Sequence, residues 1–271
     1  MGTLSREVIR QLAAHLEEAE LNATPVTKIT DEYPDMDWED AYDIQWEIRR
    51  RKLARGHRVV GLKMGLTSWA KMAQMGVKTP LYAFLADYFA VNEGQAIDTD
   101  RLIHPRLEAE IAVITAKELR GPGCTIAHVM DAISCVVPAV EIIDSRYENF
   151  RFDLKSVVAD NASSARFVTG GIMQRPEGLD LKNIGVVIEK NGEVIDQGTG
   201  AAVLGHPLSA VAMLADMLAQ RGEAIPTGTF IMTGAMTAAH AAAPGDAFVV
   251  RYDGLGEIVV RFASDTTDRE G

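Results

Sequence analysis

The first part of the chain carries the hydrophobic spacing of two amphipathic helices. From Ser5 to Leu21 apolar side chains recur every three to four residues, and Ser5 fits the N-cap position. A second helix is predicted from Asp37 to Gly56, where the glycine is a stop signal. Its arginines 49–51 are interpreted as a solvated basic face near the helix C-terminus. We therefore predict a small helical segment over residues 1–56, too short to fold alone.

Beyond residue 56 the pattern changes to short apolar runs separated by glycines, which is typical of strands. The runs are VVGLKMGL, LEAEIAVIT, SCVVPAVEIID, ARFVTGG, NIGVVIEKNGEVIDQG, FIMTGAM and AFVVRYDGLGEIVVRF. Asn191-Gly192 and Asp253-Gly254 predict two β-hairpins. Only two further helices are predicted, near residues 125–133 and 208–221, so strands and helices do not alternate regularly. The pattern indicates an α+β protein with a β-rich domain over residues 57–271.

Composition and charge exclude several kinds of partner. Of 271 residues 47% are hydrophobic and 24% charged, as in globular proteins. With 27 basic and 38 acidic residues the net charge is −11, and no basic patch stands out, so nucleic acid is not an expected partner. No apolar stretch approaches the roughly 20 residues that cross a bilayer, and no signal peptide is apparent. Two cysteines outside any zinc-like spacing fit a reducing compartment, so we expect a cytoplasmic protein without membrane association.

Three glutamates are candidates for a metal site. Glu108 and Glu110 lie two residues apart in LEAEIAVI, so on a strand they share one face, either as solvated acids or as ligands. Glu141 lies among apolar residues in CVVPAVEII, where an ionised carboxylate needs a cation or a hydrogen-bond donor. If the two strands are neighbours, the carboxylates meet without histidine or cysteine. Such a set suits Mg²⁺ or Mn²⁺.

A lysine and a short polar segment are further candidates. Lys63 lies inside VVGLKMGL, either protecting a sheet edge or held beside an anion. Gly61 and Gly65 would let a ligand or another backbone come close to it. In SVVADNASSARF, Asp160 and Ser163 form either a turn or an acid–base group with a hydroxyl donor. GTGAAVLG departs from the dinucleotide fingerprint, and no GxSxG elbow is present, so neither chemistry is expected.

Longer motifs carry a family resemblance. The segments GLKMGLTS, HPRLEAEIAV, VVPAVEIIDSRYENFRFDLKSVVADNASSARFVTGG and GAAVLGHP resemble the hydratase/decarboxylase branch of the fumarylacetoacetate hydrolase superfamily, over nearly the whole chain. The resemblance implies a mixed β-roll core with bound Mg²⁺ or Mn²⁺. It implies that the metal ligands are Glu108, Glu110 and Glu141. It further implies that Lys63 is the active-site lysine and that Asp160 orients it or moves a proton, with Ser163 contacting substrate.

Two positions favour one branch of that family over the other. Hydratases of this branch carry an arginine before the lysine and an acid after a later proline, where this chain has Leu62 and Leu81. An enzyme that adds no water has no need of that acid, so Leu81 is expected to line the substrate site of a decarboxylase. Lys155, in FDLKSVVADN, also resembles a decarboxylase feature and could meet the second carboxylate of a diacid.

The resemblance therefore implies metal-dependent decarboxylation of 2-oxo-3-hexenedioate to 2-hydroxypenta-2,4-dienoate and carbon dioxide. Two alternatives stay open. One is hydration of 2-hydroxypenta-2,4-dienoate, because hydratases share the three glutamates and the lysine. The other is a structural subunit of a decarboxylase–hydratase complex. The resemblance also implies a homo-oligomer and an association with the partner hydratase.

Overall fold

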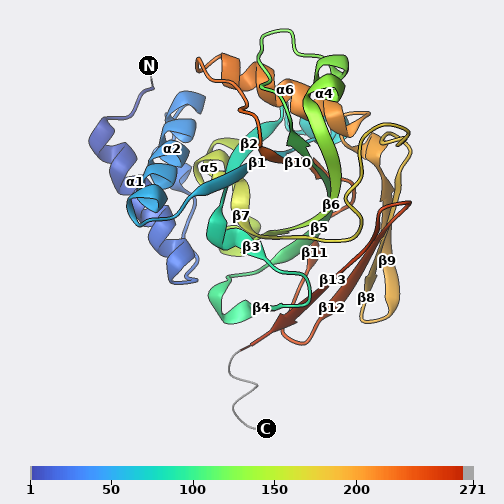
Figure 1. Cartoon of the computed structure of the whole chain (residues 1–271). Coiled ribbons are helices and arrows are strands. Elements are labelled where there is room, and N and C mark those ends of the chain that lie inside the picture. The colour runs from blue at the N-terminus through green and yellow to red at the C-terminus, as the bar shows by residue number, and fades with distance from the viewer. Residues whose placement is uncertain (1, 265–271) are drawn as a thin grey trace.

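The apolar runs beyond residue 56 form two sheets in the computed structural model, which describes residues 2–264. The larger sheet has the order β2-β1-β10-β5-β6-β7-β3, with β11 paired to β5, and the smaller sheet has the order β4-β13-β12-β8-β9. In the larger sheet β1 runs parallel to β10 and β3 parallel to β7, so that sheet is mixed. It curls around its own interior with the smaller sheet beside it (Figure 1), which confirms the predicted α+β roll.

The strand bounds follow. They are β1 (Val59–Gly65), β2 (Leu81–Ala86), β3 (Ala90–Val91), β4 (Ala96–Asp98), β5 (Arg106–Thr115), β6 (Ile133–Ile143), β7 (Ser164–Thr169), β8 (Gly185–Lys190), β9 (Glu193–Thr199), β10 (Phe230–Ala235), β11 (His240–Ala241), β12 (Ala247–Tyr252) and β13 (Gly256–Ala263). Both predicted hairpins are present, β8–β9 around Asn191-Gly192 and β12–β13 around Asp253-Gly254. The apolar run that forms β2 was not predicted, because all six of its residues are buried and leave no alternating pattern.

The helices include the four that the sequence predicts and two short ones that it does not. They are α1 (Arg6–Leu21), α2 (Trp38–Ala54), α3 (Trp69–Gln74), α4 (Ile126–Ala132), α5 (Leu154–Ala159) and α6 (Pro207–Ala219). Ser5 caps α1 by accepting a hydrogen bond from the Val8 N–H, as predicted. α5 was not predicted, and it begins where the Asp153 side chain caps it by accepting a hydrogen bond from the Ser156 N–H.

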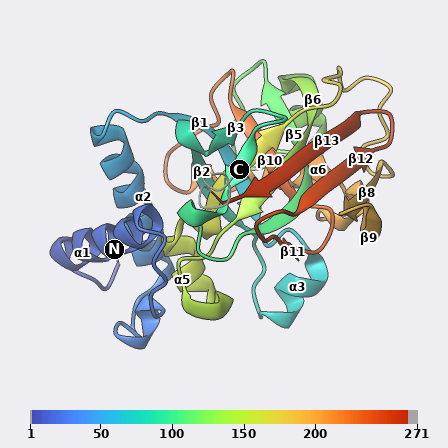
Figure 2. The same ribbon diagram turned by 90° about the horizontal axis from the view of Figure 1, so that it is seen from below.

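The N-terminal helices share a hydrophobic core with the sheet. Leu16 of α1 and Ile44 of α2 belong to a buried cluster that continues into α5, β2 and the inner residues of the larger sheet. Both helices lie on one side of the molecule, away from the β12–β13 hairpin (Figure 2). The division between residues 1–56 and 57–271 stays a prediction, and residues 1 and 265–271 lie outside the described part. The interpretation of arginines 49–51 as solvated is wrong for Arg51, which pairs with the buried Glu17 at 2.6 Å.

The segment Gly200–Ala219 is long and apolar enough to cross a membrane when judged by length and composition alone. The prediction that no apolar stretch approaches about 20 residues is therefore wrong for this segment. In the structure 56% of this segment is buried, and α6 packs against β10, β1 and α4. Its buried side chains, such as Leu208, Val211 and Leu214, belong to the cluster that lies between the two sheets and α6. The burial is that of a core helix.

Candidate active site

The three predicted glutamates meet on one face of β5 and β6. Glu108 lies directly opposite Glu141 in the antiparallel register, and Glu110 follows on the same face of β5. One carboxylate oxygen from each lies within 4.8 Å of the other two. Glu110 and Glu141 are each only 1% exposed. The prediction that the two strands are neighbours is therefore confirmed, and the cluster has the donors of a divalent metal site.

The electrostatics of this cluster favour a bound cation. Burial, followed by repulsion from Glu141, raises the pKa of Glu108 to about 7, against the opposing charge of Lys63. The same two causes raise the pKa of Glu110 well above its usual value. Within residues 2–264, Glu110 Oε1 and Glu141 Oε2 are buried and receive no hydrogen bond. Buried oxygens without donors are costly, so the residues present fit a divalent ion.

Lys63 lies beside this cluster and not at a sheet edge. β1 is flanked by β2 and β10, so the edge-protection alternative is wrong. The Lys63 Nζ is 2.8 Å from Glu141 Oε1 and donates to the Ala162 carbonyl at 2.9 Å, and the residue is 3% exposed. A Cβ on Gly61 would lie 2.6 Å from the Phe230 carbonyl oxygen. That glycine therefore admits the backbone of β10 and not a ligand.

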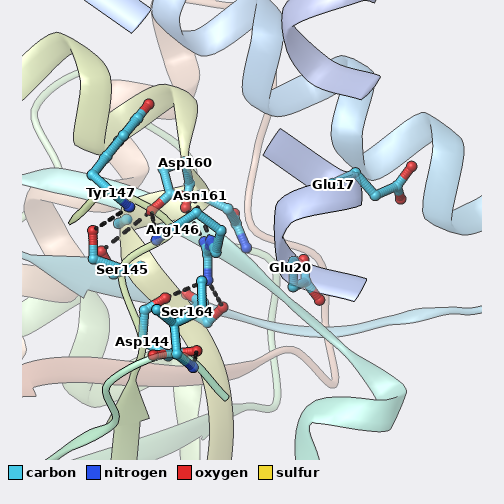
Figure 3. A network of polar contacts seen from close by, with 12 residues as sticks. Glu17, Glu20, Asp144, Ser145, Arg146, Tyr147, Asp160, Asn161 and Ser164 are labelled. Carbon is cyan, nitrogen blue, oxygen red and sulfur yellow. Dashed lines mark hydrogen bonds and ion pairs between the residues drawn. The ribbon is translucent and has the colours of Figure 1, made fainter. Parts of the chain in front are cut away.

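A backbone turn clamped by Arg146 supplies the carbonyl that binds Lys63. Asn161, Ala162 and Ser163 all have left-handed φ angles, between 49° and 58°. The Arg146 guanidinium donates to the Asp160 carboxylate, to the Asp160 carbonyl and, at 3.0 Å, to the Ser164 carbonyl. Figure 3 shows this network around Arg146. Both ends of the turn are thus held, which stabilises a conformation that non-glycine residues rarely adopt.

Asp160 is connected to Lys63 through this turn, and no direct contact joins the two side chains within residues 2–264. Its carboxylate binds Arg146, both at the guanidinium and at the backbone N–H, which lies 3.2 Å from Oδ2. Burial raises the pKa of Asp160 to about 6, and the charge of Arg146 opposes that rise. The carboxylate is therefore ionised at pH 7. The Asn161 side chain fixes the turn to β2 by bonding the N–H and the carbonyl of Phe84.

The remaining predicted residues lie at different distances from the cluster. The Ser163 hydroxyl is 3.5 Å from Asp160 Oδ2. Leu81 pairs with Gly65 on the Lys63 face of the sheet, and a Cβ on Gly65 would be 3.9 Å from the Cβ atoms of Leu81 and Ala162. Lys155 differs, because its Nζ donates to the Met36 carbonyl at 2.6 Å, on the side of the N-terminal segment. This placement does not support the expectation that Lys155 meets a substrate carboxylate.

Two site residues were missed by the sequence analysis. Gly234 donates its N–H to Glu110 Oε2 at 2.8 Å and has a φ of 111°, and a Cβ there would lie 2.1 Å from Thr67 Oγ1. Only glycine fits that position. Arg146 lies within one of the motifs that carry the family resemblance. Asp160 is fourteen residues away in the sequence, so no local pattern indicates that the two side chains pair. Both depend on contacts between distant segments of the chain.

Comparisons with known proteins agree with this geometry. The family described as fumarylacetoacetate (FAA) hydrolase C-terminal matches residues 69–263. A 4-oxalocrotonate decarboxylase of Pseudomonas putida is 64% identical over 96% of this chain and 98% of its own. A solved structure of 4-oxalocrotonate decarboxylase from Pseudomonas putida G7, complexed with magnesium and adipate, superposes with a TM-score of 0.95 at 63% identity, covering 96% and 99% of the two chains. The 2-oxo-hept-4-ene-1,7-dioate hydratase of Escherichia coli is 38% identical, over 93% and 96%.

Proposed function

The chain belongs to the fumarylacetoacetate hydrolase family, and from this premise we propose that it is a divalent-metal-dependent 4-oxalocrotonate decarboxylase. The observation that carries the proposal is the cluster of Glu108, Glu110 and Glu141 beside Lys63, in which Glu110 and Glu141 are buried. The 64% identity to a decarboxylase, against 38% to a hydratase, favours decarboxylation over hydration. Leu81, where hydratases of the family carry an acid, points the same way.

The reaction converts 2-oxo-3-hexenedioate into 2-hydroxypenta-2,4-dienoate and carbon dioxide. The bond between C5 and the C6 carboxylate breaks, and its electron pair moves through the C3–C4 double bond onto the C2 oxygen. That oxygen then takes up one proton to give the dienol. The catalytic requirement is thus to stabilise negative charge on the C2 oxygen of the 2-oxo acid.

The three glutamates would hold Mg²⁺ or Mn²⁺. When bound there, the ion supplies Lewis-acid stabilisation of charge on the substrate oxygens. Lys63 also stabilises the negative charge on the C2 oxygen, by donating a hydrogen bond to it. Its ammonium is held by Glu141 and the Ala162 carbonyl. Asp160 and Ser163 position this lysine through the turn that Arg146 clamps, and Leu81 contributes apolar surface beside it.

The test is an assay of the purified chain with 2-oxo-3-hexenedioate, following carbon dioxide release. We expect turnover with Mg²⁺, none after EDTA treatment, and recovery when Mg²⁺ is restored. Full activity in the chelator would refute a metal-dependent site. Efficient hydration of 2-hydroxypenta-2,4-dienoate by the unaltered chain would favour the hydratase alternative. Absence of any metal-dependent turnover would favour a structural subunit.

We further propose that the chain works in the cytoplasm as a homo-oligomer and associates with the hydratase that consumes its product. A small dicarboxylate is the expected ligand, and the adipate bound to the solved relative is such a molecule. The net charge of −11 gives no reason to expect nucleic acid or an acidic membrane surface as a partner. Light scattering on the purified chain, alone and mixed with a purified hydratase, measures both proposed associations.

A further inference from the structure

An arginine with no anionic partner lies next to the glutamate cluster. Arg106 is the first residue of β5, two positions before Glu108, so both side chains project from the same face. Within residues 2–264 its guanidinium makes no hydrogen bond and no ion pair, and it lies over the ring of Phe150, at 4.0 Å from the centroid. Arginine side chains left without an anion beside a polar site are suited to bind one bidentately.

Phe150 is held against this arginine by an unusual backbone. Asn149 and Phe150 both have left-handed φ angles, 55° and 56°, within η4 (Glu148–Phe150). Such residues cost free energy and persist where the surroundings fix them, often at binding sites. The Phe150 ring also lies 4.5 Å from the ring of His104, whose backbone N–H donates to Asp144. The aromatic face therefore fixes the guanidinium in place without neutralising its charge.

Arg106 and Lys63 reach the cluster from different strands. Arg106 lies on β5, two residues before Glu108, and Glu108 is opposite Glu141 of β6. Lys63 lies on β1, and its ammonium is 2.8 Å from Glu141 Oε1. One cation is therefore on the strand of Glu108 and the other is in contact with Glu141. A 2-oxo acid that binds at this pair of glutamates can place its C2 oxygen at Lys63 and its C1 carboxylate at Arg106.

Charge balance supports an anion at Arg106. Three glutamates, one divalent ion and Lys63 sum to zero, so a dianionic substrate would leave the site with uncompensated negative charge. Arg106 supplies a positive charge, and its influence on the Glu108 carboxyl opposes that of burial. The carboxylate that leaves as carbon dioxide must lose its charge in the transition state, so a strong cation there would hinder the reaction. The C1 carboxylate keeps its charge throughout.

We propose that Arg106, oriented by Phe150, binds the C1 carboxylate of the 2-oxo acid and so determines the direction in which the substrate lies in the site. This inference rests on the proposed function. It names Arg106 as a substrate-binding residue and Phe150 as a positioning residue. A 2-oxo acid with a single carboxylate keeps the C1 carboxylate that Arg106 is proposed to bind, so it can be used to test this contact.

The test compares Arg106→Met, Arg106→Lys and Phe150→Leu with the unaltered enzyme. The control is Arg151→Met, which replaces an exposed arginine directly after Phe150. Calorimetry measures Mn²⁺ binding and then 2-oxopentanoate binding to the Mn²⁺-loaded enzyme, and kinetics gives KM for 2-oxo-3-hexenedioate. For Arg106→Met we expect KM and the 2-oxopentanoate Kd to rise together by about ten- to a hundredfold, as for loss of a charged hydrogen-bonded pair. We expect Mn²⁺ affinity to stay within about twofold.

Phe150→Leu keeps the arginine and should raise both constants a few-fold, with Arg106→Lys intermediate. A higher KM with unchanged 2-oxopentanoate affinity would place Arg106 on the other carboxylate and overturn the proposal. Unchanged KM, or a parallel loss of Mn²⁺ affinity, would also overturn it. If the unaltered enzyme proves not to decarboxylate, the proposed function fails, but 2-oxopentanoate binding still tests Arg106 independently.

Discussion

Replacing Lys63 by methionine separates catalysis from metal binding. Methionine keeps the length and apolar stem of the side chain but removes the ammonium that lies 2.8 Å from Glu141 Oε1 and 2.9 Å from the Ala162 carbonyl oxygen. In the metal-loaded enzyme the substitution removes one donor to the developing charge on the C2 oxygen. Loss of one such donor costs roughly 3–4 kcal/mol, so kcat should fall by about 10²–10³. KM should change much less, because the donor acts mainly in the transition state.

The same substitution has a second effect in the metal-free protein. At 2.8 Å and an effective dielectric constant of about 20, the Lys63–Glu141 attraction is about 6 kcal/mol before desolvation is subtracted. Breaking a buried pair by removing one partner costs about 3–5 kcal/mol. Proton uptake by Glu108, whose pKa is about 7, keeps the cost near the lower value. At roughly 2–4 °C per kcal/mol, Tm should fall by about 6–12 °C.

Mg²⁺ should restore most of the Tm that Lys63→Met loses, because the dication replaces the missing positive charge. The measurements are kcat and KM at saturating Mg²⁺, Mn²⁺ affinity by calorimetry, and Tm with and without Mg²⁺. Lys117→Met, which alters an exposed lysine paired with Asp131, is the control. The reasoning is refuted if Lys63→Met keeps its kcat, or if it loses Mn²⁺ binding in proportion to activity, since the lysine would then serve the metal and not the substrate.

Three further predictions follow from the same cluster. Glu141→Gln should abolish turnover and weaken Mn²⁺ binding at least tenfold in calorimetry, because an amide is a neutral ligand; unchanged Mn²⁺ affinity would show that Glu141 is not a ligand. Because the pKa of Glu108 is raised to about 7, its contribution to the stability of the metal-free protein should be complete below about pH 4.5 and be lost as pH rises through 7. Mn²⁺ affinity should increase over the same pH range, because binding releases the proton, and calorimetry in buffers of different ionisation enthalpy measures that release. A Kd for Mn²⁺ that does not depend on pH would contradict this prediction. Gly234→Ala should lower Mn²⁺ affinity and Tm, because its Cβ would collide with Thr67 and displace the N–H that binds Glu110, whereas Gly185→Ala, in open space, should do neither.

The parts of the site that lie on single strands could be predicted from the sequence. The spacing of Glu108 and Glu110 fixes their common face, and the apolar setting of Glu141 signals a buried charge with a partner. The distance between these strands in the chain leaves their pairing open, and only the observed register brings Glu108 opposite Glu141. Lys63 illustrates the same limit, because its sequence does not tell whether β1 lies at an edge or in the middle of a sheet.

A turn was one of the two alternatives for the polar segment, but its left-handed conformation could not be predicted from local pattern. Its left-handed residues are alanine, asparagine and serine, so no glycine signals the conformation. The turn exists because Arg146, far away in the chain, binds both of its ends. The two short helices were missed for a related reason, since six residues carry too little periodicity to be recognised.

The insertion of β10 between β1 and β5 sets the order in which the site can be completed during synthesis. β5 and β6 are joined through α4 and can pair once residue 143 has left the ribosome, which brings the three glutamates together. Lys63 was made earlier, yet β1 joins β5 in the sheet only through β10, which ends at residue 235. Such distant pairings form late because of the chain entropy that they cost. The nascent chain therefore pairs the three carboxylates before Lys63 reaches them, so water, protons or a metal ion, and not the lysine, are then available to offset their mutual repulsion.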